Sequence, residues 1–369
     1  MRIALVAPYF YPVDGGREQT VLFLAEGLAE KGHYVTVFTT DRTPDGGIVE
    51  LGHEDWNFSV QRIKSAYLAF RFEMPLKIPK LSDYDIVHII STDDIFTFWF
   101  LLSAKIHGKN VLATIFTPFA LLKHPRKILR PFLSFFELLT VITMYLADAI
   151  QVKNDIDLKI VKKFTNNVRM IPDGISEHYF TDKPSIGFRE KHGLKNRKII
   201  LFVNRIHPLK GPQLLIKSLP DVIKRYPDAC VVLIGPDPEG YVSKLKTTAE
   251  RRGVLDHVMF LGFVSEEEKI AAYDAADVVA IPSIGEFTEG FSIVLSEAWA
   301  RGKTVVVTPS RALRSRVISG TGYVAGYDAE SLAKAVMKGF EEPTVPPKVH
   351  SWGEVTDMIE SEYFNLRRE

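Results

Sequence analysis

Several features that point to particular classes of protein are rare in this sequence. Cysteine occurs once, at Cys230, so neither an intrachain disulfide nor a cysteine metal cluster can form. The apolar run around it, residues 230–234, is typical of a buried strand. The 46 Lys and Arg residues nearly balance the 45 Asp and Glu residues, for a net charge of +1. Nucleic acid is therefore not an expected partner.

Long uninterrupted apolar segments are also missing. The N-terminal run reaches Pro8 after too few apolar residues for a signal peptide or a membrane span. The longest apolar tract, residues 129–149, is interrupted by charged residues and a proline, so we do not expect it to cross a bilayer. We expect a cytoplasmic protein.

The length of 369 residues exceeds what one hydrophobic core usually organises and predicts two domains. Short apolar runs alternate with amphipathic helical patterns, which is typical of βαβ units. The predicted strands are residues 3–7, 35–39, 86–90, 111–115, 149–152 and 168–171, and then 199–203, 231–234, 258–261, 278–281 and 304–307. Each half predicts an α/β fold, a doubly wound parallel sheet that binds ligands at the carboxyl ends of its strands.

The pattern weakens over residues 173–198, where turn residues dominate and where we place an interdomain linker. We predict a Rossmann-like N-terminal domain of residues 1–180 and a Rossmann-like C-terminal domain of residues 181–350, which face each other across a central cleft. An amphipathic segment at residues 352–366 comes too late to form another βαβ unit.

Two cations follow the strand predicted at residues 199–203. Arg205 offers a planar fork and Lys210 a compact point charge, so together they can neutralise a diphosphate without a metal. The alternative is that both are solvated loop residues.

Two carboxylates follow the strand predicted at residues 278–281. Glu289 lies in a loop and Glu297 lies eight residues later inside a helix. A carboxylate in the loop suits sugar hydroxyls and one in the helix suits ribose hydroxyls. Gly290 allows close approach of the backbone, and the free amides at Phe291, Ser292 and Ile293 suit an anion. Solvated acids are the alternative.

This combination of Arg205, Lys210-Gly211, Glu289-Gly290-Phe291 and Glu297-Ala298 resembles family 4 of the retaining glycosyltransferases, group 1, which have the GT-B fold. The resemblance extends over nearly the whole chain. It includes Gly15-Gly16, the sequence I-P-D-G at residues 171–174 and L-G-F-V at residues 261–264.

The resemblance implies roles for these residues. Arg205 and Lys210 would bind the donor diphosphate, Glu289 the transferred sugar and Glu297 the ribose. Gly16 would contact the donor from the opposite domain, and the backbone near Val264 would contact the base. The amides at Phe291, Ser292 and Ile293, next to Gly290, would support phosphate and sugar. The C-terminal helix, residues 351–369, would return to the first domain.

The resemblance further implies a metal-independent enzyme with no cofactor beyond its donor substrate, a UDP- or GDP-sugar. It would move a hexose, with retention of configuration, to an acceptor hydroxyl. The Asp-x-Asp sequence at residues 155–157 is then expected to begin a helix rather than to bind a metal. The chain departs from the family at Phe116, where many members carry a histidine.

A basic and aromatic segment at residues 119–146 suits an anionic membrane surface. Its cations and its apolar side chains are Lys123, Arg126, Lys127, Arg130, Leu121, Leu122, Ile128, Phe132, Phe135 and Phe136. The alternative is that its apolar face packs on the first sheet. Because family members often use lipid-linked acceptors, we expect a lipid or lipid-linked saccharide as acceptor and a peripheral location on the inner membrane face.

Three other functions remain to be compared. A dehydrogenase would share the sheets, but the loop at residues 7–16 has no Gly-x-Gly-x-x-Gly fingerprint. A non-catalytic nucleotide-sugar-binding partner of another glycosyltransferase would bind the donor without turnover. A nucleotide-sugar epimerase of the same fold would change the sugar without an acceptor.

Overall fold

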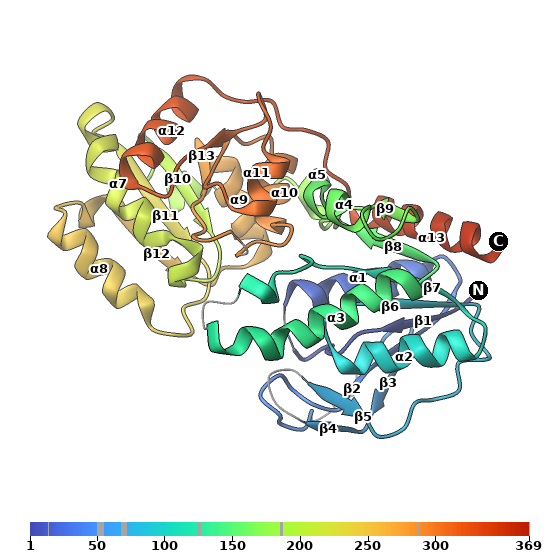
Figure 1. Ribbon diagram of the computed structural model, residues 1–369. Coiled ribbons are helices and arrows are strands. Elements are labelled where there is room, and N and C mark those ends of the chain that lie inside the picture. The colour runs from blue at the N-terminus through green and yellow to red at the C-terminus, as the bar shows by residue number, and fades with distance from the viewer. Residues whose placement is uncertain are drawn as a thin grey trace. The chain divides into compact units, whose positions relative to one another are not determined.

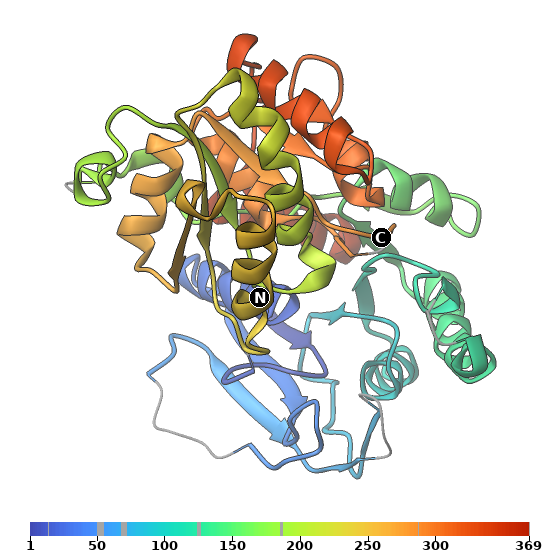
Figure 2. The ribbon, with the colours of Figure 1, turned by 90° about the vertical axis from the view of Figure 1, so that its left-hand side faces the viewer.

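The computed structural model describes residues 1–13, 15–49, 55–67, 72–123, 127–184, 187–286 and 288–368. The chain divides into two compact units, one of Met1–Gly174 with His350–Glu369 and one of Ile175–Val349. Each unit contains a parallel sheet with helices packed on both faces (Figures 1 and 2). The two sheets confirm the predicted fold class of two doubly wound domains.

The first unit is built on a seven-stranded parallel sheet in the order β3-β2-β1-β6-β7-β8-β9. Its strands are β1 (Arg2–Val6), β2 (Tyr34–Thr40), β3 (Ser59–Ile63), β6 (Ile86–Ile90), β7 (Asn110–Thr114), β8 (Ala149–Val152) and β9 (Val168–Met170), and a separate antiparallel pair is β4 (Ser65–Tyr67) with β5 (Glu73–Pro75). Its helices are α1 (Gly16–Glu30), α2 (Ile95–Ile106), η1 (Leu121–Lys123), η2 (Lys127–Leu129), α3 (Arg130–Leu146), α4 (Asp155–Val161) and α13 (Trp352–Arg368).

Alternate side chains of β1 pack into two separate hydrophobic cores in this unit. Ile3 and Leu5 pack with α1 and α13 on one face of the sheet, and Ala4 and Val6 pack with α2 on the other. A central parallel strand is covered on both faces, which explains why its sequence is continuously apolar.

The second unit repeats this order in a six-stranded sheet, β12-β11-β10-β13-β14-β15. Its strands are β10 (Lys198–Val203), β11 (Ala229–Ile234), β12 (Val258–Gly262), β13 (Val278–Ile281), β14 (Val305–Val307) and β15 (Tyr323–Val324). Its helices are α5 (His178–Thr181), α6 (Phe188–Lys191), η3 (Pro208–Lys210), α7 (Pro212–Arg225), α8 (Tyr241–Arg251), η4 (Leu255–His257), α9 (Glu266–Ala275), α10 (Ile293–Ala300), α11 (Arg311–Arg316) and α12 (Ala329–Glu341).

The segment expected to be a linker, residues 173–198, belongs largely to the second unit. Ile175, Tyr179, Phe188 and Leu194 are buried in its core, and the chain passes between the units at Gly174. These four buried apolar residues give no helical pattern in the sequence, because α5 and α6 are only four residues long. Polar turns between short packed helices look like a linker in sequence.

A buried chain of hydrogen bonds connects α13 to the first sheet. The Tyr363 hydroxyl lies 2.7 Å from His88 Nδ1, and His88 Nε2 lies 2.7 Å from Thr114 Oγ1. Thr114 donates to Gln151 Oε1 at 2.7 Å, so its hydroxyl accepts the Nε2 proton of His88. Burial, with the nearby Lys153 charge, lowers the pKa of His88 to about 3. The imidazole is therefore neutral and accepts the Tyr363 proton at Nδ1.

Helix α2 begins at a buried carboxylate. Asp94 Oδ1 accepts the backbone N–H of Thr97 at 2.7 Å, a standard N-cap bond. The side chain is 4% exposed. Burial, reinforced by the adjacent Asp93, raises the pKa of Asp94 to about 7.

Helix α3 packs one face and exposes the other. Leu133, Phe136 and Met144 are buried, whereas Phe135 and Leu138 are about half exposed. By length and composition the stretch Lys127–Leu146 is able to cross a membrane, although 39% of its most apolar window is buried. Buried helices of soluble proteins meet the same test, so the expectation that it does not span stays a prediction.

We predict that Tyr363→Phe destabilises the first unit. The change leaves His88 Nδ1 buried without its donor, which costs about 1–3 kcal/mol. Urea unfolding followed by circular dichroism measures this, with the exposed Tyr34→Phe as control, expected within about 0.5 kcal/mol of wild type. Equal stability of the two variants would contradict the buried hydrogen-bond chain.

We also predict a pH-dependent effect of Asp94→Asn. Because the folded pKa is raised, the folded state binds a proton that the unfolded state releases, so Asp94 costs stability progressively as pH rises from about 4 to about 7. Asparagine keeps the cap acceptor and does not ionise. The stability of the variant relative to wild type should therefore increase over this range and then level off. Urea midpoints at several pH values test this, and a constant difference would refute it.

Candidate functional site

Each sheet has one point where the strand order reverses, and polar loops meet there. In the second unit, β11 and β12 lie to one side of β10 and β13 lies to the other. The loops that follow β10 and β13 therefore leave neighbouring strands at the same edge. Ligands of open α/β sheets bind at such reversals.

An ion pair joins these two loops. Lys210 Nζ lies 2.8 Å from Glu289 Oε1, and the Ser283 hydroxyl donates to the same oxygen at 2.6 Å. Glu289 is 6% exposed. The structure thus brings together two of the three predicted catalytic residues, and Ser283, which follows β13, is a partner that the sequence did not reveal.

The backbones of the two loops are also in contact. The Ile284 amide donates to the Leu209 carbonyl at 2.7 Å. Gly211 has a φ of 75°, and a Cβ there would lie 1.9 Å from the Pro282 carbonyl oxygen. Only glycine fits this close approach. Gly211 therefore fixes Lys210 beside Glu289.

Arg205 occupies the same edge with its side chain exposed. Its backbone N–H donates a hydrogen bond to Asn204 Oδ1 at 3.0 Å. Among the residues that the structure describes, none forms an ion pair with its guanidinium. The fork is consequently available for a ligand.

The turn before α10 has an unusual backbone conformation. Ser292 has a φ of 68°, an uncommon conformation for serine, and its hydroxyl is buried without a partner among the described atoms. Strain of this kind is concentrated at functional sites. Gly290 is exposed, Phe291 is buried and Ile293 is the first residue of α10.

Arg316 of α11 holds this turn in place. Its Nη1 donates to the carbonyls of Phe291 at 2.7 Å and Ser292 at 3.0 Å, and its Nη2 donates to Ser296 Oγ at 2.7 Å. Its guanidinium carbon also lies 3.8 Å from the centre of the Phe291 ring. Two carbonyls of the turn are thereby held by one side chain of α11.

Glu297 lies inside α10 and is held by α9. The Tyr273 hydroxyl donates to Glu297 Oε2 at 2.7 Å, and Lys269 Nζ lies 3.5 Å from Oε1. Burial and the Glu297 charge raise the pKa of Tyr273. A carboxylate has about four acceptor positions, so Glu297 retains capacity for ligand hydroxyls.

Val264 follows β12, at the same edge of the second sheet. It is half-buried and packs against the core that contains α9 and α10. The preceding Phe263 is 83% exposed. The backbone at Val264 is thus anchored next to a large exposed aromatic ring.

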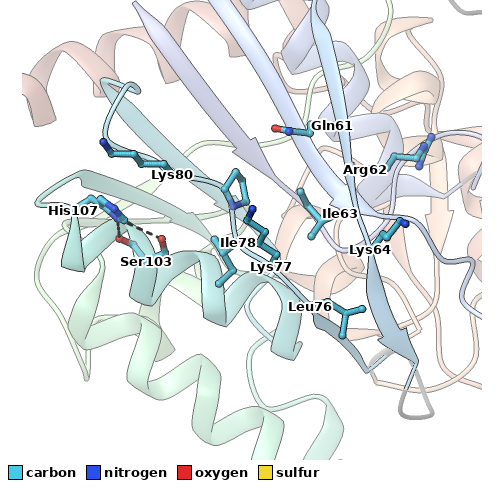
Figure 3. A pocket seen from close by; sticks show the side chains of 11 residues that line it. Gln61, Arg62, Ile63, Lys64, Leu76, Lys77, Ile78, Lys80, Ser103 and His107 are labelled. Carbon is cyan, nitrogen blue, oxygen red and sulfur yellow. Dashed lines mark hydrogen bonds between the residues drawn. The ribbon is translucent and has the colours of Figure 1, made fainter.

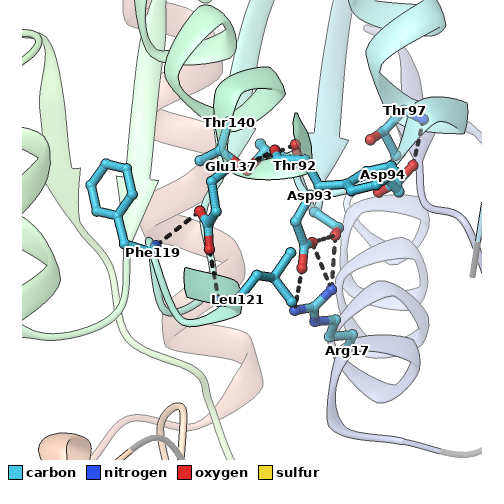
Figure 4. Close-up of polar contacts among 11 residues, drawn as sticks. Arg17, Thr92, Asp93, Asp94, Thr97, Phe119, Leu121, Glu137 and Thr140 are labelled. Carbon is cyan, nitrogen blue, oxygen red and sulfur yellow. Dashed lines mark hydrogen bonds and ion pairs between the residues drawn. The ribbon is translucent and has the colours of Figure 1, made fainter. Parts of the chain in front are cut away.

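The first unit has its own reversal, between β1 and β6. Gly16 begins α1 there. The next residue, Arg17, lies 3.0 Å from Asp93 Oδ1 and 2.9 Å from Ser91 Oγ, which both follow β6 (Figure 4). Ser91 has a φ of 92°. These three residues, with Tyr9 and the cap residue Asp94, line a small pocket that the sequence reasoning missed.

Phe116 is placed between two cations. The Arg17 guanidinium carbon lies 4.9 Å and Lys153 Nζ lies 3.9 Å from the ring centre. Lys153 is almost fully buried and pairs with Asp173. The residue at the usual histidine position therefore contacts positive charge through its ring face.

The loop after Phe116 is fixed from α3. Glu137, which is buried, accepts the backbone N–H groups of Phe119 and Leu121, each at 2.9 Å (Figure 4). A charged residue inside the apolar helix thus has a structural role. Arg126, one of the cations of the basic and aromatic segment, lies outside the described residues.

The described residues contain no cluster of three or more His, Cys, Asp or Glu side chains that could hold a metal ion. The Asp-x-Asp sequence at residues 155–157 begins α4, where Asn154 caps the Asp157 amide at 2.9 Å. This confirms its predicted position at a helix start.

Comparisons with known proteins cover both units. Residues 14–178 match the family Glycosyltransferase Family 4, and residues 186–356 match Glycosyl transferases group 1. A phosphatidyl-myo-inositol mannosyltransferase of Mycolicibacterium smegmatis is 29% identical over 361 residues, which are 93% of this chain and 85% of that protein. A GDP-mannose-dependent alpha-(1-6)-phosphatidylinositol monomannoside mannosyltransferase of the same organism is 34% identical over 174 residues, 45% of each chain.

A solved structure supports the fold. Sucrose-phosphate synthase from Thermosynechococcus elongatus superposes with a TM-score of 0.75 at 21% sequence identity, over 99% of this chain and 98% of that one. At this identity the likeness establishes the GT-B architecture alone. Taken with the two family matches, which together extend from residue 14 to residue 356, it leads to one assignment: the chain belongs to the family 4, group 1 glycosyltransferases.

Proposed function

We propose that this chain is a retaining, metal-independent glycosyltransferase. It transfers a hexose from a nucleotide-diphosphate sugar to a hydroxyl of a lipid or lipid-linked saccharide. The observation that carries the proposal is the Lys210–Glu289 pair at the strand-order reversal of the second unit, where open α/β sheets bind their ligands.

The diphosphate is bound by Arg205 and Lys210. Arg205 has an available guanidinium that binds two phosphate oxygens side by side. Lys210 donates to Glu289 and has further protons for a phosphate oxygen. The amides of Phe291, Ser292 and Ile293 add donors at the start of α10.

The other donor contacts use the remaining predicted residues. Glu289 accepts hydrogen bonds from the transferred sugar, and Glu297 accepts them from the ribose. The backbone at Val264 contacts the base, with Gly290 permitting close approach of the sugar. Gly16 contributes from the first unit, where the absence of a side chain leaves its backbone accessible, since a Cβ there would meet nothing within 4 Å.

Transfer breaks the bond between the sugar C1 and the diphosphate oxygen. Negative charge develops on the diphosphate, where Arg205 and Lys210 stabilise it, and the sugar ring becomes cationic. The acceptor oxygen attacks C1 from the face that the diphosphate leaves, and its proton passes to the departing phosphate oxygen. Two fixed cations perform the electrostatic role that a metal ion has in other transferases.

The lipid acceptor is supported by two observations. Relatives with similarity over most of the chain are named as phosphatidyl-myo-inositol mannosyltransferases. In addition, Ile128, Phe132, Phe135 and Leu138 are exposed at helical spacing along η2 and α3. With Lys127 and Arg130 nearby, this apolar stripe suits the surface of an anionic membrane, so we place the protein peripherally on the inner face.

Non-catalytic binding of a nucleotide sugar is the second candidate. Phe116, which carries no proton-transfer or hydrogen-bonding group where many family members carry a histidine, is the observation that favours it. The two functions differ in turnover, since a binding partner would retain the donor intact.

We predict that Glu289→Gln lowers the rate of nucleotide release about tenfold to a hundredfold, because hydrogen bonds to a charged group contribute about 1.5–3 kcal/mol. The assay uses a panel of nucleotide sugars without divalent metal, with and without a membrane-lipid extract. Glu286→Gln is the matched control, because Glu286 is an exposed carboxylate in the same loop. Donor binding without release by the wild-type protein would favour the non-catalytic function.

We predict that Phe135→Ser weakens sedimentation with anionic vesicles about tenfold, because burying one aromatic side chain contributes about 1.5–3 kcal/mol. Ile106→Ser removes an exposed apolar residue at the end of α2, outside the stripe, and should leave binding unchanged. Equal losses in both variants, or none, would exclude α3 as the membrane contact.

A further inference from the structure

A large pocket lies in the first unit, away from the residues discussed so far. Its volume is about 790 Å³, within the range of small-molecule sites. It is formed by the end of β3, the segment between β5 and β6, and the end of α2 (Figure 3). It shares no lining residue with the small pocket beside Arg17 and Asp93.

The charged residues that line this pocket are all basic. They are Arg62, Lys64, Lys77 and Lys80, with His107 in addition, and the described lining contains no acidic side chain. The three lysines are exposed and form no ion pair with any described residue. Since the net charge of the whole chain is only +1, the pocket is a local concentration of positive charge. Such a concentration attracts anions.

The lysines are held in place by apolar neighbours. Ile78 packs on the core beneath the sheet and Leu81 is fully buried there, so the segment that carries Lys77 and Lys80 is anchored on both sides of Lys80. At its start, the Leu76 amide donates to the Lys64 carbonyl at 2.9 Å. This bond joins the two segments that supply the lysines.

The rest of the lining combines apolar surface with one oriented ring. Ile63, Leu76, Ile78 and Pro79 supply the apolar part. His107 Nδ1 lies 2.7 Å from the Ser103 carbonyl, so Nδ1 carries a proton and donates. The other ring nitrogen, Nε2, is left for a ligand. Arg62 is turned to the Tyr11 carbonyl and contributes mainly charge.

We infer that this pocket binds a phosphate ester whose organic part is apolar. Flexible ammonium groups are point-charge partners of phosphate, and three of them surround the pocket without acidic partners in the described part of the chain. The apolar lining accommodates the group esterified to the phosphate. The ligand is either a phosphate ester in solution or the headgroup of a membrane phospholipid, which present the same chemistry.

Two probes distinguish these sources. Calorimetric titration with phenyl phosphate tests a soluble phosphate ester. Sedimentation with vesicles of phosphatidylcholine alone, and of phosphatidylcholine with phosphatidylglycerol, tests a lipid headgroup. The test variant is Lys64→Gln, Lys77→Gln and Lys80→Gln combined. The matched control combines Lys159→Gln, Lys162→Gln and Lys163→Gln, which removes three exposed lysines of the same unit and the same total charge.

We expect the pocket variant, and not the control, to lose affinity for at least one probe. The loss should be about tenfold or more, since each lysine near an anionic surface contributes about fivefold. Loss of phenyl phosphate binding identifies a soluble ligand. Loss of the extra binding to phosphatidylglycerol vesicles alone identifies a headgroup. Circular dichroism verifies that both variants fold.

Two results would overturn the inference. One is that neither probe distinguishes the pocket variant from the control. The other is that nucleotide release, measured on the same samples, falls with the pocket variant, because the site would then belong to the transfer machinery. A chain without any transfer activity still gives a valid binding result. The outcome of this binding test is therefore independent of the proposed function.

Discussion

The reversal of strand order in each sheet is the constraint on which both polar sites depend. At that point two loops leave adjacent strands and turn in opposite directions, so the edge between them is not closed by a crossover helix. In both units an ion pair bridges the two loops, Arg17–Asp93 in the first and Lys210–Glu289 in the second. The cation follows the first strand and the carboxylate follows the fourth. A repeated topology thus gives two chemically similar edges.

The central strands were predictable because burial on both faces demands continuous apolar sequence. Strands at the margins were not. β3 alternates exposed and half-buried residues at the edge of its sheet, and β15 has only two residues, so neither carries that pattern. The division between the units at Gly174 has no clear sequence signal for a related reason. Apolar anchors such as Tyr179 and Phe188 are separated by polar turns, and their contacts are with residues far along the chain.

Residues of the candidate site could be predicted from sequence only where they belong to a motif within one loop or helix. Lys210 and Glu289 belong to recognisable motifs, whereas Ser283 and Arg316 act through contacts that no spacing rule predicts. The same holds for Lys269 and Tyr273, which reach Glu297 from a neighbouring helix. Three segments must come together before the basic pocket exists. Side-chain partners on separate elements are a property of the packed fold, and sequence motifs report mainly the residues that share one loop.

The position of α13 has a consequence for the order in which the protein can be completed during synthesis. The core of the first unit includes Trp352, Val355, Ile359 and Tyr363, which leave the ribosome after every residue of the second unit. Domains generally fold as units while the chain emerges. The second unit, Ile175–Val349, has its whole sequence available first, whereas the N-terminal sheet must wait with one face covered by α1 but not yet by α13. The N-terminal unit is therefore the last part of the chain to complete its core.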